Sequence, residues 1–87
     1  MSDSNQVPAP IATAVLAHVV RSIVDDPDAV AVEGSEGRNR VRLEVRVGPN
    51  DLGRVIGKRG KTAQAIRTLV RAAASRDGVE ADVDFAD

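Results

Sequence analysis

Two glycines flank two long cationic residues in the segment Gly57-Lys58-Arg59-Gly60, which is the part of this sequence best suited to chemistry. Glycine adopts backbone angles that other residues avoid, and its missing side chain lets a ligand approach the peptide N–H groups. Lys58 and Arg59 would project from the loop into solvent, and Lys61 adds a third charge directly after it. These residue types predict a loop that binds phosphate groups.

Aliphatic residues on both sides of the loop predict an apolar wall beside the phosphates. Val55 and Ile56 precede the loop, and Ile66 and Leu69 follow it. A nucleobase lying on such a wall would present its edge to the backbone of a neighbouring strand. Arg54, three residues before the loop, is a plausible further phosphate contact.

Helices and strands must hold this loop in place, and their periodicities can be recognised in the sequence. A helix is expected from Pro10 to the break at Asp25-Asp26-Pro27, and a second long one from Lys61 to Arg76. A short helix from Asp51 to Ile56 leads into the loop. Strands are expected at 30–32, 41–47 and 79–85, with a hairpin loop over Gly34 to Asn39.

Apolar spacing predicts which side of each long helix faces the core. In the first helix, Ile11, Val15, Val19 and Ile23 recur every four residues, and Leu16, Val20 and Val24 widen the stripe. In the second, the expected core residues are Ala63, Ile66, Leu69, Val70 and Ala73.

The order α-β-β-α-α-β indicates an α+β fold. The first two strands should form an antiparallel hairpin, whereas the second and third are joined through helices and should run parallel with a right-handed crossover. We therefore expect a three-stranded mixed sheet with three helices on one face, formed by residues 10–87. Residues 1–9 are polar and punctuated by proline, which predicts a disordered N-terminal tail.

Charge is distributed unevenly in a chain whose net charge is −1. From Arg38 to Arg71 ten Lys/Arg stand against two acids, a local balance of +8, and the remainder carries −9. Such asymmetry suggests one basic face for a polyanion and an acidic remainder that limits indiscriminate binding. Arg40, Arg42 and Arg46 could extend that face, although for Arg42 and Arg46 solvation or pairing with acids of the third strand is favoured. For Arg67 and Arg71, one turn apart on the second long helix, the sequence does not decide between contact with nucleic acid and simple solvation.

Composition narrows the function classes. A domain of 87 residues has a thin core with little room for a deep catalytic pocket. The absence of cysteine and the single histidine, His18, exclude cysteine-based zinc sites and a histidine metal cluster within one chain. No general acid–base or nucleophile–base pair is apparent, so we expect no enzyme, no metal and no cofactor. The lack of a membrane-length apolar run or signal-peptide pattern predicts a cytoplasmic protein.

Gly60-Lys61-Thr62 also looks like the end of a nucleotide-binding P-loop. That motif needs a glycine at position 55, where the sequence has Val55. It also needs a larger domain, so this reading is disfavoured. The only aromatic residue, Phe85, is expected in the core of the last strand, and a platform of stacked aromatic residues is therefore not predicted.

The segment Val55-Ile56-Gly57-Lys58-Arg59-Gly60, with Ile66 six residues later, resembles the K-homology (KH) signature. The resemblance is strongest to the KhpA family of stand-alone bacterial KH proteins, and it rests mainly on residues 49–61 and Ala65-Ile66-Arg67. It implies a type II-like KH domain whose G-x-x-G loop clamps about four nucleotides of single-stranded RNA. The implied function is that of an RNA chaperone or post-transcriptional regulator. Ala63 departs from the pattern, because a larger aliphatic residue is usual there, and the groove wall should be shallower.

The alternative is a protein–protein interaction module with little RNA binding of its own. Five alanines, at positions 63, 65, 72, 73 and 74, give the second long helix a small-residue surface that permits close helix approach. The family resemblance implies self-association or pairing with a second KH protein of the KhpB type. The residues alone do not distinguish RNA from DNA.

Overall fold

The computed structural model describes residues 8–87, and its first helix begins at Pro10 as the sequence predicted. Most of the predicted tail, residues 1–7, lies outside the described residues. Ala9, which we had included in the tail, is only 7% exposed and belongs to the core.

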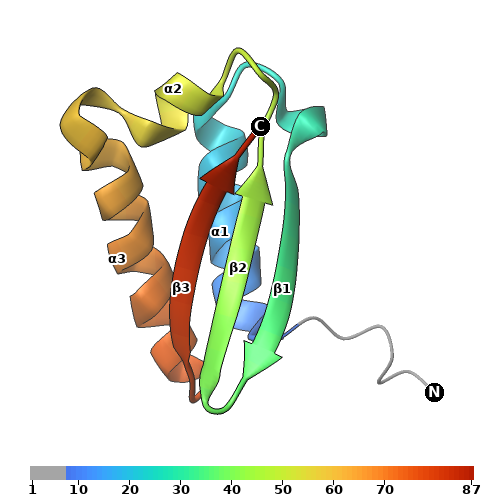
Figure 1. Ribbon diagram of the computed structural model, residues 1–87, viewed down its shortest axis with the longest axis vertical. Coiled ribbons are helices and arrows are strands. Elements are labelled where there is room, and N and C mark those ends of the chain that lie inside the picture. The colour runs from blue at the N-terminus through green and yellow to red at the C-terminus, as the bar shows by residue number, and fades with distance from the viewer. Residues whose placement is uncertain (1–7) are drawn as a thin grey trace.

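The predicted element order α-β-β-α-α-β is confirmed (Figure 1). Two single-turn 3-10 helices interrupt the loops, at Pro27–Ala29 and Lys58–Gly60. The main elements are α1 (Pro10–Ile23), β1 (Ala31–Gly37), β2 (Arg40–Arg46), α2 (Leu52–Ile56), α3 (Lys61–Arg76) and β3 (Glu80–Ala86).

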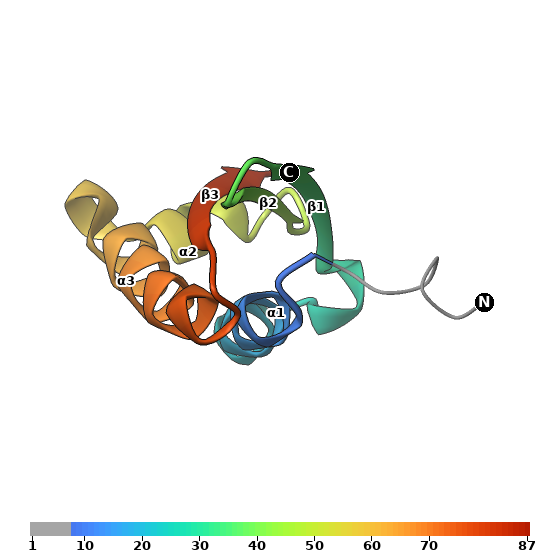
Figure 2. The same cartoon turned by 90° about the horizontal axis from the view of Figure 1, so that it is seen from below.

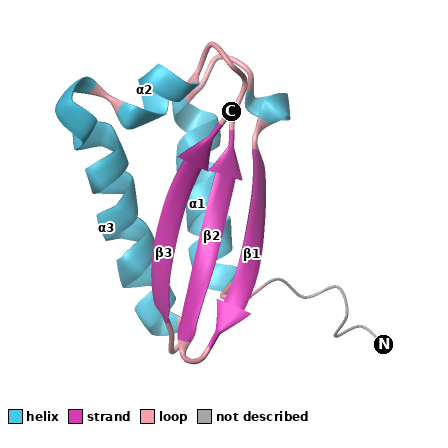
Figure 3. Ribbon diagram, viewed as in Figure 1, coloured by secondary structure: helices cyan, strands magenta, loops and turns pink. Residues whose placement is uncertain are grey.

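The three strands form one mixed sheet in the order β1-β2-β3 (Figure 3). β1 pairs with β2 antiparallel and β2 with β3 parallel, as expected from the hairpin and the helical crossover. Seen from below, α1 and α3 lie side by side under the same face of the sheet, and α2 lies on that side too (Figure 2). Within residues 8–87 no helix covers the opposite face of the sheet.

The hairpin loop is shorter than predicted. β1 continues to Gly37, and Gly37 pairs with Arg40, so only Arg38 and Asn39 form the turn. Asn39 has φ +58°, a left-handed conformation that asparagine tolerates better than most residues. Gly34, which we had assigned to the loop, lies inside the strand, where an added Cβ would come 3.1 Å from Leu43 Cδ2. Gly34 is the strand partner of Leu43, so this glycine marks a close approach within the sheet, whereas Gly37 directly precedes the turn.

The buried side of α1 is shifted by one residue from the predicted stripe. Ala12, Leu16 and Val20 are fully buried, whereas Ile11 is 42% exposed. Ala12 was not among the predicted core residues, although its small side chain is buried where α1 lies close to its neighbours. Val15, Val19 and Ile23 remain at the margin of the core, partly buried.

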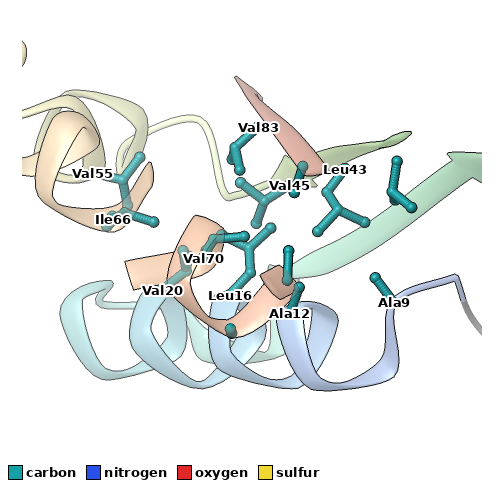
Figure 4. Packing of buried hydrophobic residues seen from close by; sticks show 14 of the residues in the cluster. Ala9, Ala12, Leu16, Val20, Leu43, Val45, Val55, Ile66, Val70 and Val83 are labelled. Atoms are coloured by element: carbon teal, nitrogen blue, oxygen red, sulfur yellow. The ribbon is translucent and has the colours of Figure 1, made fainter. Parts of the chain in front are cut away.

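The core lies between the sheet and the two long helices. Figure 4 shows Leu43, Val45 and Val83 of the sheet facing Leu16, Val20 and Val70 of the helices. The alternation predicted for β2 is confirmed, since Val41, Leu43 and Val45 are buried while Arg42 and Arg46 are exposed. In α3 the predicted core residues are buried except for one: Leu69 is 51% exposed, so its predicted place in the core was wrong.

Two carboxylates from distant parts of the chain fix the ends of α1. Asp77 accepts hydrogen bonds from the N–H groups of Ile11 (3.1 Å) and Ala12 (2.9 Å), and thereby caps a helix start that has no side-chain cap of its own. Asp51, which is 2% exposed, accepts from the N–H groups of Asp25 and Asp26, both at 3.1 Å. The second contact ties the end of α1 to the start of α2, which leads into the glycine-framed loop.

Candidate functional site

The glycine-framed loop is a tight turn between two helices. α2 ends at Ile56, where the N–H of Gly57 donates to the carbonyl of Gly53 (2.9 Å). The chain then makes the single 3-10 turn Lys58–Gly60, closed by the N–H of Gly60 donating to the carbonyl of Gly57 (3.1 Å). α3 starts immediately, at Lys61, as predicted.

The two loop glycines are needed for different reasons. Gly57 has φ +76° and ψ 173°, a region that is nearly confined to glycine. A Cβ there would also collide with the side chain of Thr62. Gly60 has φ +73°, but an added Cβ would meet nothing within 4 Å. Gly57 therefore fixes the shape of the loop, while Gly60 leaves open space beside it.

Between the glycines the backbone presents two cations at the surface. Arg59 itself has φ +59°, a left-handed conformation unusual for a residue with a side chain. Lys58, Arg59 and Lys61 are all exposed, and together they line a surface hollow.

The start of α3 adds to this positive field. The first turn of the helix contains no acidic residue, and Gly60 provides no side-chain cap. The N–H of Lys61 donates to the carbonyl of Lys58, but no carboxylate opposes the positive end of the dipole of this 16-residue helix, which lies beside the three cations. Such a surface attracts an anion.

The structure separates the aliphatic residues that the sequence grouped as a wall. Val55 (0% exposed) and Ile66 (2%) lie next to one another in the core, beneath the loop (Figure 4). Ile56 is half-buried, and Leu69 is exposed farther along α3. Val55 and Ile66 can therefore hold α2 against α3, but neither presents a free surface to a ligand.

Arg54 lies beside the loop but is already paired. Its Nη2 contacts Asp25 Oδ2 at 3.0 Å, and its Nε lies 3.5 Å from Asp51 Oδ1. The guanidinium thus joins α2 to the chain that follows α1. Its geometry suits the positioning of the loop better than an independent phosphate contact.

The arginines of β2 lie on the open face of the sheet and are paired with acids. Arg40 contacts Glu80 (2.8 Å) and Asp82 (2.9 Å), and the hydrogen bond and charge of Asp82, followed by the charge of Glu80, raise the pKa of Arg40. Arg42 contacts Asp84 at 3.4 Å, and Arg46 contacts Glu44 at 3.4 Å. For Arg42 and Arg46 the favoured interpretation, pairing on the solvated sheet face, is confirmed, although the partner of Arg46 comes from its own strand.

Arg67, left undecided by the sequence, occupies the junction between α3 and the edge strand β3. Its Nε donates to the carbonyl of Val83 (3.3 Å), and its Cζ lies 5.2 Å from the centre of the Phe85 ring. Phe85 is partly buried and packs against the core, as expected. The only signal for this contact in the sequence was the spacing of Gln64, Arg67 and Arg71 along one side of a helix, which does not name a partner.

Two further features of residues 8–87 bear on other functions. No helix in this part of the chain combines the length and apolar character needed to cross a bilayer. Within the same residues, His, Cys, Asp and Glu side chains form no group of three or more suited to a metal ion.

The comparison with protein families gives a match over most of the chain. The model of the KhpA/KhpB KH domain matches residues 13–85. A protein of Leifsonia xyli subsp. xyli named RNA-binding protein KhpA is 54% identical over 68 residues, which cover 78% of this chain and 90% of that protein. Proteins of the same name are 52% identical in Streptomyces coelicolor (78% of this chain, 85% of that one) and 40% identical in Chlamydia trachomatis (80% and 90%).

Solved structures give the same fold at lower sequence identity. Aquifex aeolicus Era bound to GDP.AlF4- superimposes with a TM-score of 0.69 and 19% identity, over 93% of this chain and 32% of Era. Era in complex with MgGDPNP and nucleotides of 16S ribosomal RNA gives 0.67 and 18%, over 93% and 31%. This chain thus corresponds to about a third of Era, and the likeness shows the fold alone. The family match and the curated relatives establish that the chain belongs to the KhpA/KhpB family of KH-domain proteins.

Proposed function

We propose that this protein binds single-stranded RNA without catalysing a reaction, and that the loop Gly57–Gly60 clamps the sugar–phosphate chain. The observation that carries the proposal is the cluster of Lys58, Arg59 and Lys61 around an uncapped helix start. Backbone N–H groups and a helix dipole favour anions at such a site, and long cations neutralise phosphates that approach it.

The loop glycines have separate tasks in this proposal. Gly57 holds the sharp turn, since no other residue fits against Thr62 at its φ and ψ. Gly60 has free space around it, which allows a phosphate to lie close to the backbone.

In this proposal the residues next to the loop support it, contact a base or hold α2 in position. Val55 and Ile66 support it from the core, and the half-buried Ile56 is the aliphatic residue left to contact a base. Arg54 keeps α2 in place through Asp25 and Asp51 and meets RNA only at the margin.

The curated relatives support RNA as the ligand, because those of Leifsonia, Streptomyces and Chlamydia are named RNA-binding proteins. The cellular role that we propose is that of an RNA chaperone or post-transcriptional regulator acting in the cytoplasm. A small loop that neutralises only a few phosphates suits transient binding to many RNAs better than tight binding to one.

A direct test of the ligand class is a competition experiment. A fluorescent single-stranded RNA bound to the protein is challenged with the same sequence as single-stranded RNA, duplex RNA or single-stranded DNA. We expect single-stranded RNA to compete best. Equal competition by the duplex would contradict a clamp that needs unpaired nucleotides, and absence of any binding would contradict the proposed function.

We further propose that the protein forms a homodimer or pairs with a KH protein of the KhpB type. The exposed side of α3 carries Ala65, Leu69 and Ala72 at helical spacing, with Leu69 51% exposed. Small residues around one large apolar side chain allow a second helix to approach closely. Two loops in one dimer would raise affinity for a longer RNA through avidity.

A further inference from the structure

The seam between α3 and β3 contains an arginine, Arg67, whose guanidinium contacts both elements. α3 and β3 lie side by side, with β3 at the edge of the sheet (Figures 1 and 2). Arg67 spans the seam: Nε donates to Val83 O at 3.3 Å, and Nη1 contacts Gln64 Oε1 at 3.4 Å. The guanidinium carbon Cζ lies over the ring of Phe85, the only Phe, Tyr or Trp in the chain, 5.2 Å from its centroid.

Most of the donor groups of this guanidinium are still free. An arginine has five N–H donors in a planar fork. The contacts to Val83 and Gln64 engage two of them, and within residues 8–87 the Nη2 group has no hydrogen-bond partner. The contact to Val83 uses Nε, so the Nη2 donors are left for a ligand.

The position of Arg67 suits contact with a base rather than a phosphate. It lies six residues after Lys61, about 9 Å along the helix axis from the loop that attracts the phosphates. It is half-buried beside an aromatic ring, whereas Lys58 and Arg59 are exposed. A nucleotide whose phosphate lies at the loop can turn its base into this seam.

The chemistry of the seam is set by Arg67. Without it, the edge of β3 would offer the Val83 carbonyl, an acceptor that suits amino groups on adenine or cytosine. With Arg67 bound to that carbonyl, the same place offers donors only. Guanine presents two adjacent acceptors, O6 and N7, that match an arginine fork, and unpaired RNA bases are read on this edge.

Resting on the proposed RNA binding, we infer that Arg67 is a specificity-determining residue that makes the α3–β3 seam select guanine over adenine. Gln64, Val83 and Phe85 orient its guanidinium, which then binds guanine O6 and N7. The loop supplies affinity for phosphates, and the seam supplies the base preference.

The test compares short oligoadenosine RNA with the same RNA carrying one guanosine, one inosine or one 7-deazaguanosine. For the wild type we expect guanosine to strengthen binding roughly tenfold. Inosine keeps O6 and N7 and should bind like guanosine, whereas 7-deazaguanosine lacks N7 and should lose most of the gain.

Substitutions at position 67 test whether Arg67 causes the preference for guanosine. Arg67→Met should abolish the difference between guanosine and adenosine, and Arg67→Lys, which keeps the charge but not the fork, should lose most of it. Arg71→Met is the matched control, one turn farther along the same helix, and should leave the ratio unchanged. Thermal unfolding of each variant reports on the fold.

The outcomes separate this inference from the proposed function. A guanosine preference that survives in Arg67→Met, or equal weakening for both RNAs as expected of a purely structural arginine, would overturn the inference and leave RNA binding intact. A wild type that binds RNA without base preference would also overturn it. Only a wild type that binds none of these RNAs would remove the proposed function itself.

Discussion

The backbone of Gly57 lies directly against Thr62, the second residue of α3. A Cβ at position 57 would collide with the Thr62 side chain and lie 2.9 Å from its backbone nitrogen. This contact fixes the angle between the loop and the helix start, and so sets where Lys58 and Arg59 stand relative to the N–H groups of α3. The proposed phosphate clamp therefore depends on the missing side chain of Gly57.

The two loop glycines should differ in their tolerance of alanine. Gly57→Ala combines a steric collision with a glycine-only conformation, so we expect it to lower the free energy of unfolding by about 3 kcal/mol. Gly60→Ala meets no neighbour and should cost about 1 kcal/mol, for its left-handed φ alone. Urea unfolding followed by circular dichroism measures both. Equal losses would show that the Thr62 contact does not restrict position 57.

The carboxylates that bracket α1 should also contribute unequally to stability. Asp51→Ala removes a buried acceptor from two N–H groups and leaves Arg54 with one carboxylate fewer, so a loss of about 2 to 3 kcal/mol is expected. Asp77→Ala removes a more exposed helix cap and should cost about 1 kcal/mol. The same unfolding measurement tests the order, and a larger loss for Asp77→Ala would contradict it.

RNA affinity should depend only modestly on salt, because few cations surround the loop. With three phosphates neutralised by Lys58, Arg59 and Lys61, the slope of log K against log salt should be about −2 for a single strand. In Lys58→Gln/Arg59→Gln only one phosphate would still be neutralised, so the slope should become shallower, about −0.7. Fluorescence anisotropy at several KCl concentrations gives both slopes. An unchanged slope in the variant would mean that the phosphates are held elsewhere.

Self-association through α3 should depend on Leu69. Because Leu69 is 51% exposed, Leu69→Gln should change the stability of the monomer by no more than about 0.5 kcal/mol while weakening the dimer. Ile11→Gln, the same kind of change at an exposed apolar residue of α1, is the matched control. Sedimentation equilibrium distinguishes the two. A strictly monomeric wild type would contradict the homodimer but not RNA binding.

The elements with strong periodicity could be predicted from the sequence. The bounds of α3, Lys61–Arg76, are those expected from its apolar spacing and from the glycines at each end. The buried and exposed sides of β2 follow its strict alternation, and the parallel pairing of β2 with β3 follows from the helices between them.

Contacts between distant residues could not be predicted in this way. Asp77 caps α1 from a position 65 residues later than Ala12, and no local pattern indicates that partnership. Arg54 and Arg67 are similar residues in the sequence, yet the fold gives one a pair of carboxylates and the other a carbonyl and an aromatic ring. Leu69 shows that periodicity can also predict burial wrongly, because an apolar residue at helical spacing faces solvent where no other element covers it.

The most direct test of the phosphate clamp is the affinity of a short single-stranded RNA for two variants with the same charge. Lys58→Gln/Arg59→Gln and Arg38→Gln/Arg76→Gln each change the net charge from −1 to −3, but only the first alters the loop. At fixed salt, with the fold of each verified by circular dichroism, we predict a loss of about tenfold or more for the loop variant and less than about twofold for the control. Equal affinities of the two variants would contradict the assignment of RNA binding to Gly57-Lys58-Arg59-Gly60.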